Sequence, residues 1–382
     1  MKLTLRHIIN NFIHRIGHHC ESSSMRDLFE YHGFPMSEPM AFGLDATMGF
    51  GFFDTTSQVS FIPESDIPFF LGGKQGTIEP NSLACRLLGI VLRKQSFSNA
   101  EKAWKESKVL LDQDIPLLLR VDIAYMPYEG FDEELDVAHF GGHTVTLGGY
   151  DEAKGVAYVG DTEFEGFQEV PIDILKTARS STYGPKFLHP TNTQFSMNPR
   201  PDGKHPPLAA GVKLAIQKVV TNMLRPSSNN NGIKGLKQFA NSIPTWKDKL
   251  NKNITNSKGE EVSLAYLMFE LTYGYIETWG TGGGSFRKLY KDFLEELLIH
   301  PELREAPRAW NSNEFGILEE CIPIINESAQ NWTFIAETLM KSCDQYKNNC
   351  LNHVDFGELH NIAQNITIKE EEVFKKLSKI KN

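Results

Sequence analysis

The chain has 382 residues, of which 40% are hydrophobic and 23% charged, and its 39 basic and 48 acidic side chains leave a formal net charge of −9. This composition is typical of a folded globular protein, and the length predicts two domains that each bury a core. The acidic balance argues against a general nucleic-acid binder, and no apolar run approaches the roughly 18 residues of a membrane-spanning helix. We also expect no signal peptide, and the five cysteines are too few for a disulfide framework, so we expect a cytoplasmic protein.

The first part of the chain mixes helical and strand patterns. Ile115–Met126 is apolar and partly β-branched, as in a buried strand, and His143–Tyr150 and Val156–Asp161 flank a turn, as in a β-hairpin. Helical spacing of apolar residues precedes these strands, at Glu21–Tyr31, Pro80–Ile90 and Ala100–Leu111.

The pattern changes near residue 200. The run Asn198–Pro207 is rich in proline and glycine and places a domain boundary there, with one domain at 1–198 and a second at 205–382. Strand signals fade beyond the boundary, and helical spacing appears at 208–224, 233–239, 264–278, 285–299 and 331–346. The fold class predicted is therefore α+β, with a mainly helical second domain.

Cys20 is the first candidate for chemistry. It lies where the His18-His19 turn meets the first predicted helix, and the positive end of a helix dipole favours a thiolate. A buried structural cysteine is the common alternative, and the other four cysteines have settings that suggest only packing.

A histidine and an aspartate lie on the two strands of the predicted hairpin. If the turn centres on Ala153, paired residues have numbers that sum to about 306, and Asp161 becomes the diagonal neighbour of His143 on the same face. Asp161 can then orient the imidazole, as in a nucleophile–base–orienter triad. A partly buried histidine at a strand edge is the plain alternative for His143 alone.

Several motifs resemble one family. The segments HCESSSMRDLFEYHG, FGLDATMGFGFF, HFGGHTVTLGGYD and GDTE resemble the N-terminal domain of the butirosin-biosynthesis acyltransferase family, a relative of the bacteriocin-processing, papain-like cysteine peptidases. The segment GTGGGSFRKLYKDFLEE, at Gly280–Glu296, resembles the motif of the helical domain that follows in that family. The resemblance implies a papain-like first domain and a helical second one.

The resemblance also implies acyl transfer from an acyl-carrier-protein thioester to an amine acceptor such as an aminoglycoside. Cys20 would form the acyl-enzyme, His143 would act as the base and Asp161 would hold its tautomer. The chain would need no cofactor of its own, since the partner acyl-carrier protein brings the phosphopantetheine. A papain-like cysteine peptidase or amide hydrolase with the same triad, and a non-catalytic binding module, remain the alternatives.

Other residues are candidates for binding. His14 lies six residues before Cys20, where the related peptidases carry an oxyanion-hole Gln; it is either an oxyanion donor or a surface histidine. Asp122, Tyr125 and Tyr128, in VDIAYMPY, match a recurring family segment and either hold a cationic acceptor or belong to a core strand.

The second domain offers two more candidates. Arg287 follows the glycine-rich loop Gly280–Gly284 and either holds an anion, such as the carrier's phosphate, or serves helix packing. Residues 204–258 hold ten basic residues and one acidic residue, Asp248, and are where an acidic carrier protein would dock, unless these lysines are ordinary solvated helix faces. We expect no metal, because the glycines between His139 and His143 disfavour the helix that would align the two imidazoles.

Overall fold

The computed structural model describes residues 5–54, 67–75, 83–131, 139–184, 186–255, 259, 261–305 and 309–381. They form an α+β protein that divides into two compact units, Met1–Ala41 with Thr77–Pro206, and Phe42–Gly76 with Pro207–Asn382. The predicted cut near residue 200 would leave Phe42–Gly76 in the first domain, whereas in the structure this segment is part of the second unit.

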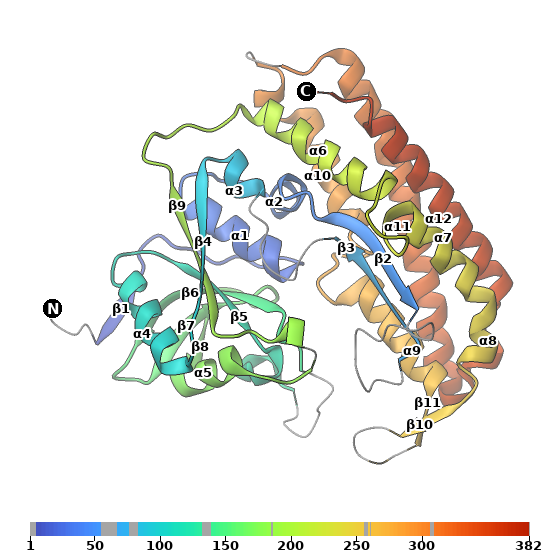
Figure 1. Cartoon of the computed structure of the whole chain (residues 1–382), viewed down its shortest axis with the longest axis horizontal. Coiled ribbons are helices and arrows are strands. Elements are labelled where there is room, and N and C mark those ends of the chain that lie inside the picture. The colour runs from blue at the N-terminus through green and yellow to red at the C-terminus, as the bar shows by residue number, and fades with distance from the viewer. Residues whose placement is uncertain are drawn as a thin grey trace. The chain divides into compact units, whose positions relative to one another are not determined.

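The first unit is built around a seven-stranded antiparallel sheet (Figure 1). Along its main path the strand order is β4 (Ile90–Ser96), β9 (Thr193–Pro199), β5 (Leu117–Val121), β6 (His143–Asp151), β7 (Val156–Gly160) and β8 (Phe167–Pro171), and β1 (Arg6–Ile8) pairs with β6. Strand β4 was not predicted; the helix expected at Pro80–Ile90 is shorter, with α3 at Leu83–Leu87.

Helices cover this sheet. All residues of β5 and β6 are buried, which requires both faces to be covered, and α1 (Cys20–Tyr31), α4 (Ala100–Leu111) and α5 (Ile172–Ser180) pack there. The bounds of α4 agree with the prediction. The short helices η1 (Ile123–Tyr125), η2 (Pro127–Glu129) and η4 (Lys186–Leu188) lie in the connections, and α2 (Glu38–Leu44) leads into the second unit.

The register of the β6–β7 hairpin is the one that the sequence predicts at the end that carries His143. Thr146 pairs with Gly160 and Leu147 with Val159, and in both pairs the numbers sum to 306, before a bulge shifts the register by one residue. The two strands therefore bring the first residue of β6 and the residue after β7 to the same end of the sheet.

The second unit is mainly helical. Its helices are α6 (Leu208–Leu224), α7 (Gly232–Ser242), α8 (Trp246–Lys249), α9 (Leu264–Tyr273), α10 (Arg287–Ile299), α11 (Ser312–Tyr346) and α12 (Phe356–Leu377), with η5 (Ile243–Thr245), the π-helical η6 (Gly274–Thr278), η7 (Pro301–Leu303) and η8 (Lys347–His353). Strands β10 (Asn253–Thr255) and β11 (Glu261–Ser263) form a small hairpin. Helix α6 has the predicted bounds, whereas α12 and the first half of α11 were not predicted.

Aromatic packing explains why Phe42–Gly76 belongs to the second unit. The segment contains the hairpin of β2 (Met48–Asp54) and β3 (Phe69–Lys74). Phe52 packs against Phe239 of α7, and Phe69 stacks on Trp246 with ring centroids 4.6 Å apart. These phenylalanines bury their apolar area only against helices that come more than 150 residues later in the chain.

Although α11 has 35 residues, no helix in the described part of the chain combines the length and the apolar character needed to cross a membrane.

Candidate active site

Cys20, His143 and Asp161 come together in the first unit. Cys20 is the first residue of α1, His143 is the first residue of β6, and Asp161 directly follows β7. His143 Nε2 lies 2.8 Å from each carboxylate oxygen of Asp161, and the Cys20 side chain hydrogen bonds with the same imidazole. Because Nε2 faces Asp161, Nδ1 is the ring nitrogen left for the thiol. This is the order of a nucleophile, a base and an orienting carboxylate.

The electrostatics of the three residues favour a charged imidazole. Burial alone would lower the pKa of His143, but the charge and hydrogen bond of Asp161, together with Cys20, raise it well above 6.5. Burial would raise the pKa of Asp161, but His143, Tyr128 and the Thr162 N–H lower it below 3.8. His143 therefore keeps its proton at neutral pH, beside a thiol that is partly accessible to solvent.

Tyr128 supports Asp161. Its hydroxyl donates to Asp161 Oδ2 at 2.8 Å, while the Thr162 N–H donates to Oδ1 at 2.7 Å. Burial and the Asp161 charge raise the pKa of Tyr128, so the phenol stays protonated and remains a donor. The sequence suggested Tyr128 as a substrate-binding residue, whereas in the structure it helps hold the triad carboxylate.

Glu38 fixes the turn before Cys20. Its carboxylate, at the start of α2, accepts from the backbone N–H groups of His18 and His19, both at 2.8 Å, and from the Ser22 hydroxyl at 3.0 Å. Gly17 makes this approach possible, because a Cβ there would lie 2.4 Å from Ser23 Cβ and 2.9 Å from Glu38 Oε2. No motif or spacing in the sequence singles out Glu38.

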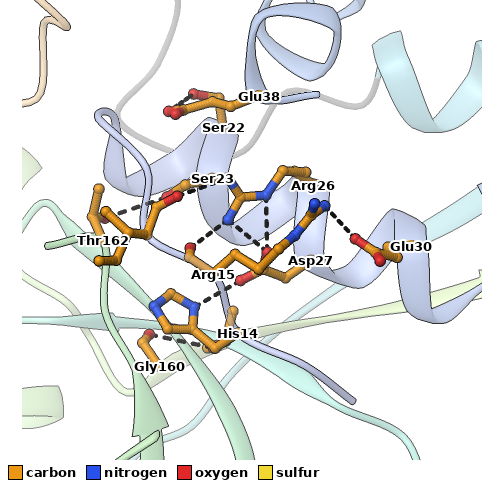
Figure 2. Close-up of polar contacts among 12 residues, drawn as sticks. His14, Arg15, Ser22, Ser23, Arg26, Asp27, Glu30, Glu38, Gly160 and Thr162 are labelled. Carbon is orange, nitrogen blue, oxygen red and sulfur yellow. Dashed lines mark hydrogen bonds and ion pairs between the residues drawn. The ribbon is translucent and has the colours of Figure 1, made fainter. Parts of the chain in front are cut away.

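His14 does not have the predicted oxyanion role. Its Nδ1 lies 2.7 Å from the buried Asp27 carboxylate (Figure 2). Its Nε2 lies 2.8 Å from the Asp161 carbonyl oxygen and 3.1 Å from the Phe164 carbonyl oxygen. Both ring nitrogens are thus occupied by acceptors, and no N–H is left for an oxyanion. His14 instead donates a hydrogen bond to the backbone carbonyl of Asp161.

A cluster of buried charged side chains links His14 to α1. Arg26 donates to Asp27 Oδ1 through Nε at 3.0 Å and Nη2 at 2.8 Å, and also to the carbonyls of Arg15 and Ile16 (Figure 2). A charged pair between Met25 and Leu28, at the buried core of the helix, is the sequence signal that could have revealed it.

Two further bonds tie the chain on either side of Cys20 to Thr162, the residue after Asp161. The Gly17 N–H donates to the Thr162 carbonyl at 2.8 Å, and the Ser23 and Thr162 hydroxyls lie 3.3 Å apart (Figure 2). The segments that carry Cys20 and Asp161 are therefore held in one hydrogen-bonded network.

Glu129, the last residue of η2, also reaches the site. Its carboxyl and the ligand atoms of His143 and Asp161 all lie within 4.8 Å of one another. Burial, with the Asp161 charge second, raises the pKa of Glu129 to about 7. These three residues could contribute ligand atoms to a cation, but His143 would first have to give up its hydrogen bond to Asp161. His139 takes no part in this group, since its Nδ1 bonds to Asp122.

Two family models match the chain. One, described as "Butirosin biosynthesis protein H, N-terminal", matches residues 19–162, and the other, described as "Domain of unknown function (DUF4872)", matches residues 173–377, more than half of the chain. The chain therefore belongs to the family described as "Domain of unknown function (DUF4872)", and its N-terminal part is similar to the N-terminal domain of butirosin biosynthesis protein H. The resemblance seen in the sequence is thereby confirmed. No curated protein matches the chain.

The two matches divide the candidate residues of the chain between them. Cys20, His143 and Asp161 all lie in the N-terminal match, and the Gly280–Glu296 motif lies in the second. The second match begins within α5, in the first structural unit, before the boundary that the sequence predicts near residue 200.

Asp122 serves the fold of this family member rather than an open binding site. The fully buried carboxylate accepts from His139 Nδ1 at 2.8 Å, the Ser181 hydroxyl at 2.5 Å and the Phe140 N–H at 3.0 Å. With these donors in place it has no room for the acceptor ammonium that the sequence suggested. Tyr125 packs against His139 in the same cluster, with ring centroids 5.5 Å apart, and burial raises its pKa.

Arg287 is not available to an anion. It is fully buried and forms a bidentate ion pair with Glu370, with Nε and Nη2 each 2.8 Å from a carboxylate oxygen. In the preceding loop the Gly284 N–H is bonded to Glu277, and a Cβ on Gly284 would lie 2.9 Å from Ala329. Of the two roles considered for this motif, the structure supports tight helix packing.

The basic segment 204–258 is partly neutralised within the second unit. Lys213, Lys237 and Lys249 form ion pairs with Glu314, Glu371 and Asp54. Lys234 and Lys247 are exposed, and residues 256–258 lie outside the described residues.

Proposed function

We propose that the chain is a cysteine-dependent acyltransferase with a papain-like first unit, which moves an acyl or aminoacyl group from an acyl-carrier-protein thioester to an amine. The observation that carries this proposal is the Cys20–His143–Asp161 arrangement at the end of the β6–β7 hairpin. The family name supports a role in antibiotic biosynthesis.

In the first half-reaction the Cys20 thiolate, paired with protonated His143, attacks the thioester carbonyl carbon and forms a new carbon–sulfur bond. The carbon–sulfur bond to the carrier's phosphopantetheine breaks, and His143 gives its proton to the leaving thiolate. The exchange of one thioester for another is nearly thermoneutral, so positioning and oxyanion stabilisation must supply the rate.

With His14 occupied, the backbone N–H of Cys20 is our candidate oxyanion donor. The first N–H groups of a helix have no intrahelical acceptor, and no described residue accepts from this one. In the second half-reaction the amine attacks the acyl-enzyme, and Cys20 leaves as the thiolate beside protonated His143.

Intact-mass spectrometry tests the proposal. Incubation with an acyl-carrier-protein thioester should add the acyl mass to the protein, and addition of an aminoglycoside should discharge it as an amide. Cys20→Ala should abolish the adduct, whereas Cys85→Ala, which removes a buried thiol, should keep it. Peptide cleavage without acyl capture would replace the transferase with the hydrolase, and an adduct that persists in Cys20→Ala would show that Cys20 is not the nucleophile.

We further propose that the acyl-carrier protein docks on the basic segment 204–258. The exposed side chains of Lys234, Lys237 and Lys247 support this site. Reversal of the three to Glu should weaken carrier binding and flatten its dependence on salt, measured by titration at two ionic strengths. Unchanged affinity would remove this docking site and leave the chemistry at Cys20 untouched.

A further inference from the structure

The triad does not use every charged group at its own site. Glu129 places a half-buried carboxyl within 4.8 Å of a ring nitrogen of His143 and a carboxylate oxygen of Asp161. No described residue donates a hydrogen bond to this carboxyl or forms an ion pair with it. A carboxylate that loses its hydrating water on burial and gains no hydrogen-bond donor is stabilised when a cation binds to it.

The described groups around Glu129 do not supply this cation. Asp161 and Glu163 are acidic, Tyr128 is a neutral phenol, and His143 is the one base among the described groups that act on Glu129. Since the imidazolium is already paired with Asp161, the ionised Glu129 leaves a net negative charge beside His143, the residue that bonds to Cys20.

Acylation gains nothing from this negative charge. The thioester carbonyl is neutral, and the phosphopantetheine arm that delivers it is anionic. An amine acceptor, by contrast, arrives at neutral pH as an ammonium ion, which a carboxylate attracts.

The proton balance of the second half-reaction also requires a second acceptor. An ammonium must lose one proton before its nitrogen can attack the acyl-enzyme and a second when the amide forms. His143, left neutral after acylation, takes one of these protons and so restores its charged state beside the Cys20 thiolate. One proton remains without an acceptor in the triad.

We propose that Glu129 binds the ammonium group of the acceptor beside the acyl-enzyme and accepts its first proton. The proposal rests on the proposed transferase function and names the group that selects a cationic acceptor. The carboxylate takes one proton from the ammonium, and the free amine forms a carbon–nitrogen bond with the acyl carbon. The second proton passes to His143 as the carbon–sulfur bond to Cys20 breaks, and Glu129 later returns its proton to water.

The raised pKa of Glu129, about 7, suits this role. A base with a pKa near the working pH is ionised often enough to bind the ammonium and basic enough to take its proton. Both properties come from its burial beside Asp161.

The first experiment needs no acyl donor. Cys20 is labelled with a cationic and an anionic methanethiosulfonate reagent in the intact protein, in Glu129→Gln and in the control Glu165→Gln, which changes an exposed carboxylate. At pH 8 we expect the unmodified protein and the control to favour the cationic reagent by about tenfold relative to a free thiol. Glu129→Gln should lose most of this preference, and the unmodified protein should lose it at pH 6 as Glu129 takes up its proton. Equal selectivity in Glu129→Gln and the unmodified protein would overturn the proposal.

The second experiment follows discharge of the Cys20 acyl-enzyme by two amines at pH 7.5. Ethanolamine is then a cation and methoxyamine is neutral. Glu129→Gln should slow discharge by ethanolamine about 10²-fold, the usual size of a general-base effect, and change discharge by methoxyamine less than about threefold. Equal slowing of both amines, or of neither, would overturn the role of Glu129. If the unmodified protein captures no acyl group, the transferase function fails, and the labelling experiment still decides whether Glu129 directs cations to Cys20.

Discussion

Two of the buried groups of charged residues, one in each unit, differ in how completely their hydrogen bonds and charges are satisfied. In the second unit the Arg287–Glu370 pair is closed: Arg287 also donates to the Ser285 carbonyl, and Glu370 also accepts from Ser328 and Trp332. In the first unit His143 and Asp161 are equally well bonded, but one ring nitrogen meets a partly accessible thiol, and Glu129 stands beside them without a donor. A buried charge therefore indicates a structural role when all its partners are protein groups, and a role in catalysis or binding when one of its sides is left open.

The largest effect on the acylation rate should come from a substitution in the His143–Asp161 group. Asp161→Asn removes the charge that stabilises the His143 imidazolium and turns a donor toward Tyr128 and the Thr162 N–H. We expect the rate of Cys20 acylation, measured by quenched-flow mass spectrometry, to fall about 10³- to 10⁴-fold, with the fold retained. A loss smaller than tenfold would mean that Asp161 does not orient His143.

Substitution in the Arg287–Glu370 pair should instead change the free energy of unfolding. Arg287→Met leaves the Glu370 carboxylate buried without its cation, which costs about 3–5 kcal/mol in the free energy of unfolding. Lys237→Met, which breaks the exposed pair with Glu371, should cost less than about 1 kcal/mol. Urea unfolding followed by tryptophan fluorescence measures both, because the second unit carries Trp246, Trp279, Trp310 and Trp332. Equal costs for the two variants would refute the distinction between closed and exposed pairs.

A smaller effect is expected at Tyr128, which bonds to the Asp161 carboxylate and which the sequence suggested as a substrate-binding residue. Tyr128→Phe removes one hydrogen bond to a charged acceptor, worth about 1.5–3 kcal/mol, while His143 and Thr162 still hold Asp161. We expect acylation to slow about tenfold and the ratio of ethanolamine to methoxyamine discharge to stay unchanged. A change in that ratio would place Tyr128 at the acceptor, as the sequence first suggested.

The smallest effect concerns pH and stability. The pKa of Glu129 rises from an ordinary 4.5 to about 7, so between these values the folded protein holds a proton that the unfolded chain has lost. Stability from this group is therefore present at low pH and lost as the pH rises through 7. Glu129→Gln should raise the melting temperature by about 1–2 °C at pH 8, since water screens the half-exposed carboxyl, and by nothing at pH 4. A gain of the same size at both pH values would point to packing rather than charge.

Local patterns predicted much of the fold and of the triad. The bounds of α4 and α6 follow from apolar spacing, and the strand pattern with its turn gave the hairpin register that sets Asp161 beside His143. These features depend on residues that are close together in the sequence, so they can be predicted from the sequence alone. Phe42–Gly76 was assigned to the wrong unit, because phenylalanines indicate burial without indicating which helices bury them.

The length and charge of the chain predicted two domains and an acidic protein, and the motifs predicted Cys20, His143 and Asp161 with their family. Only the tertiary structure decided what the other polar residues do. His14, Asp122 and Arg287 each have the chemistry for binding, yet each is occupied by partners from other segments of the chain. Glu38 and Glu129 have ordinary sequence settings and gain their importance from where the fold places them. The reason is physical: residue type sets which hydrogen bonds and charges a side chain can offer, and the packing of distant segments determines which remain available.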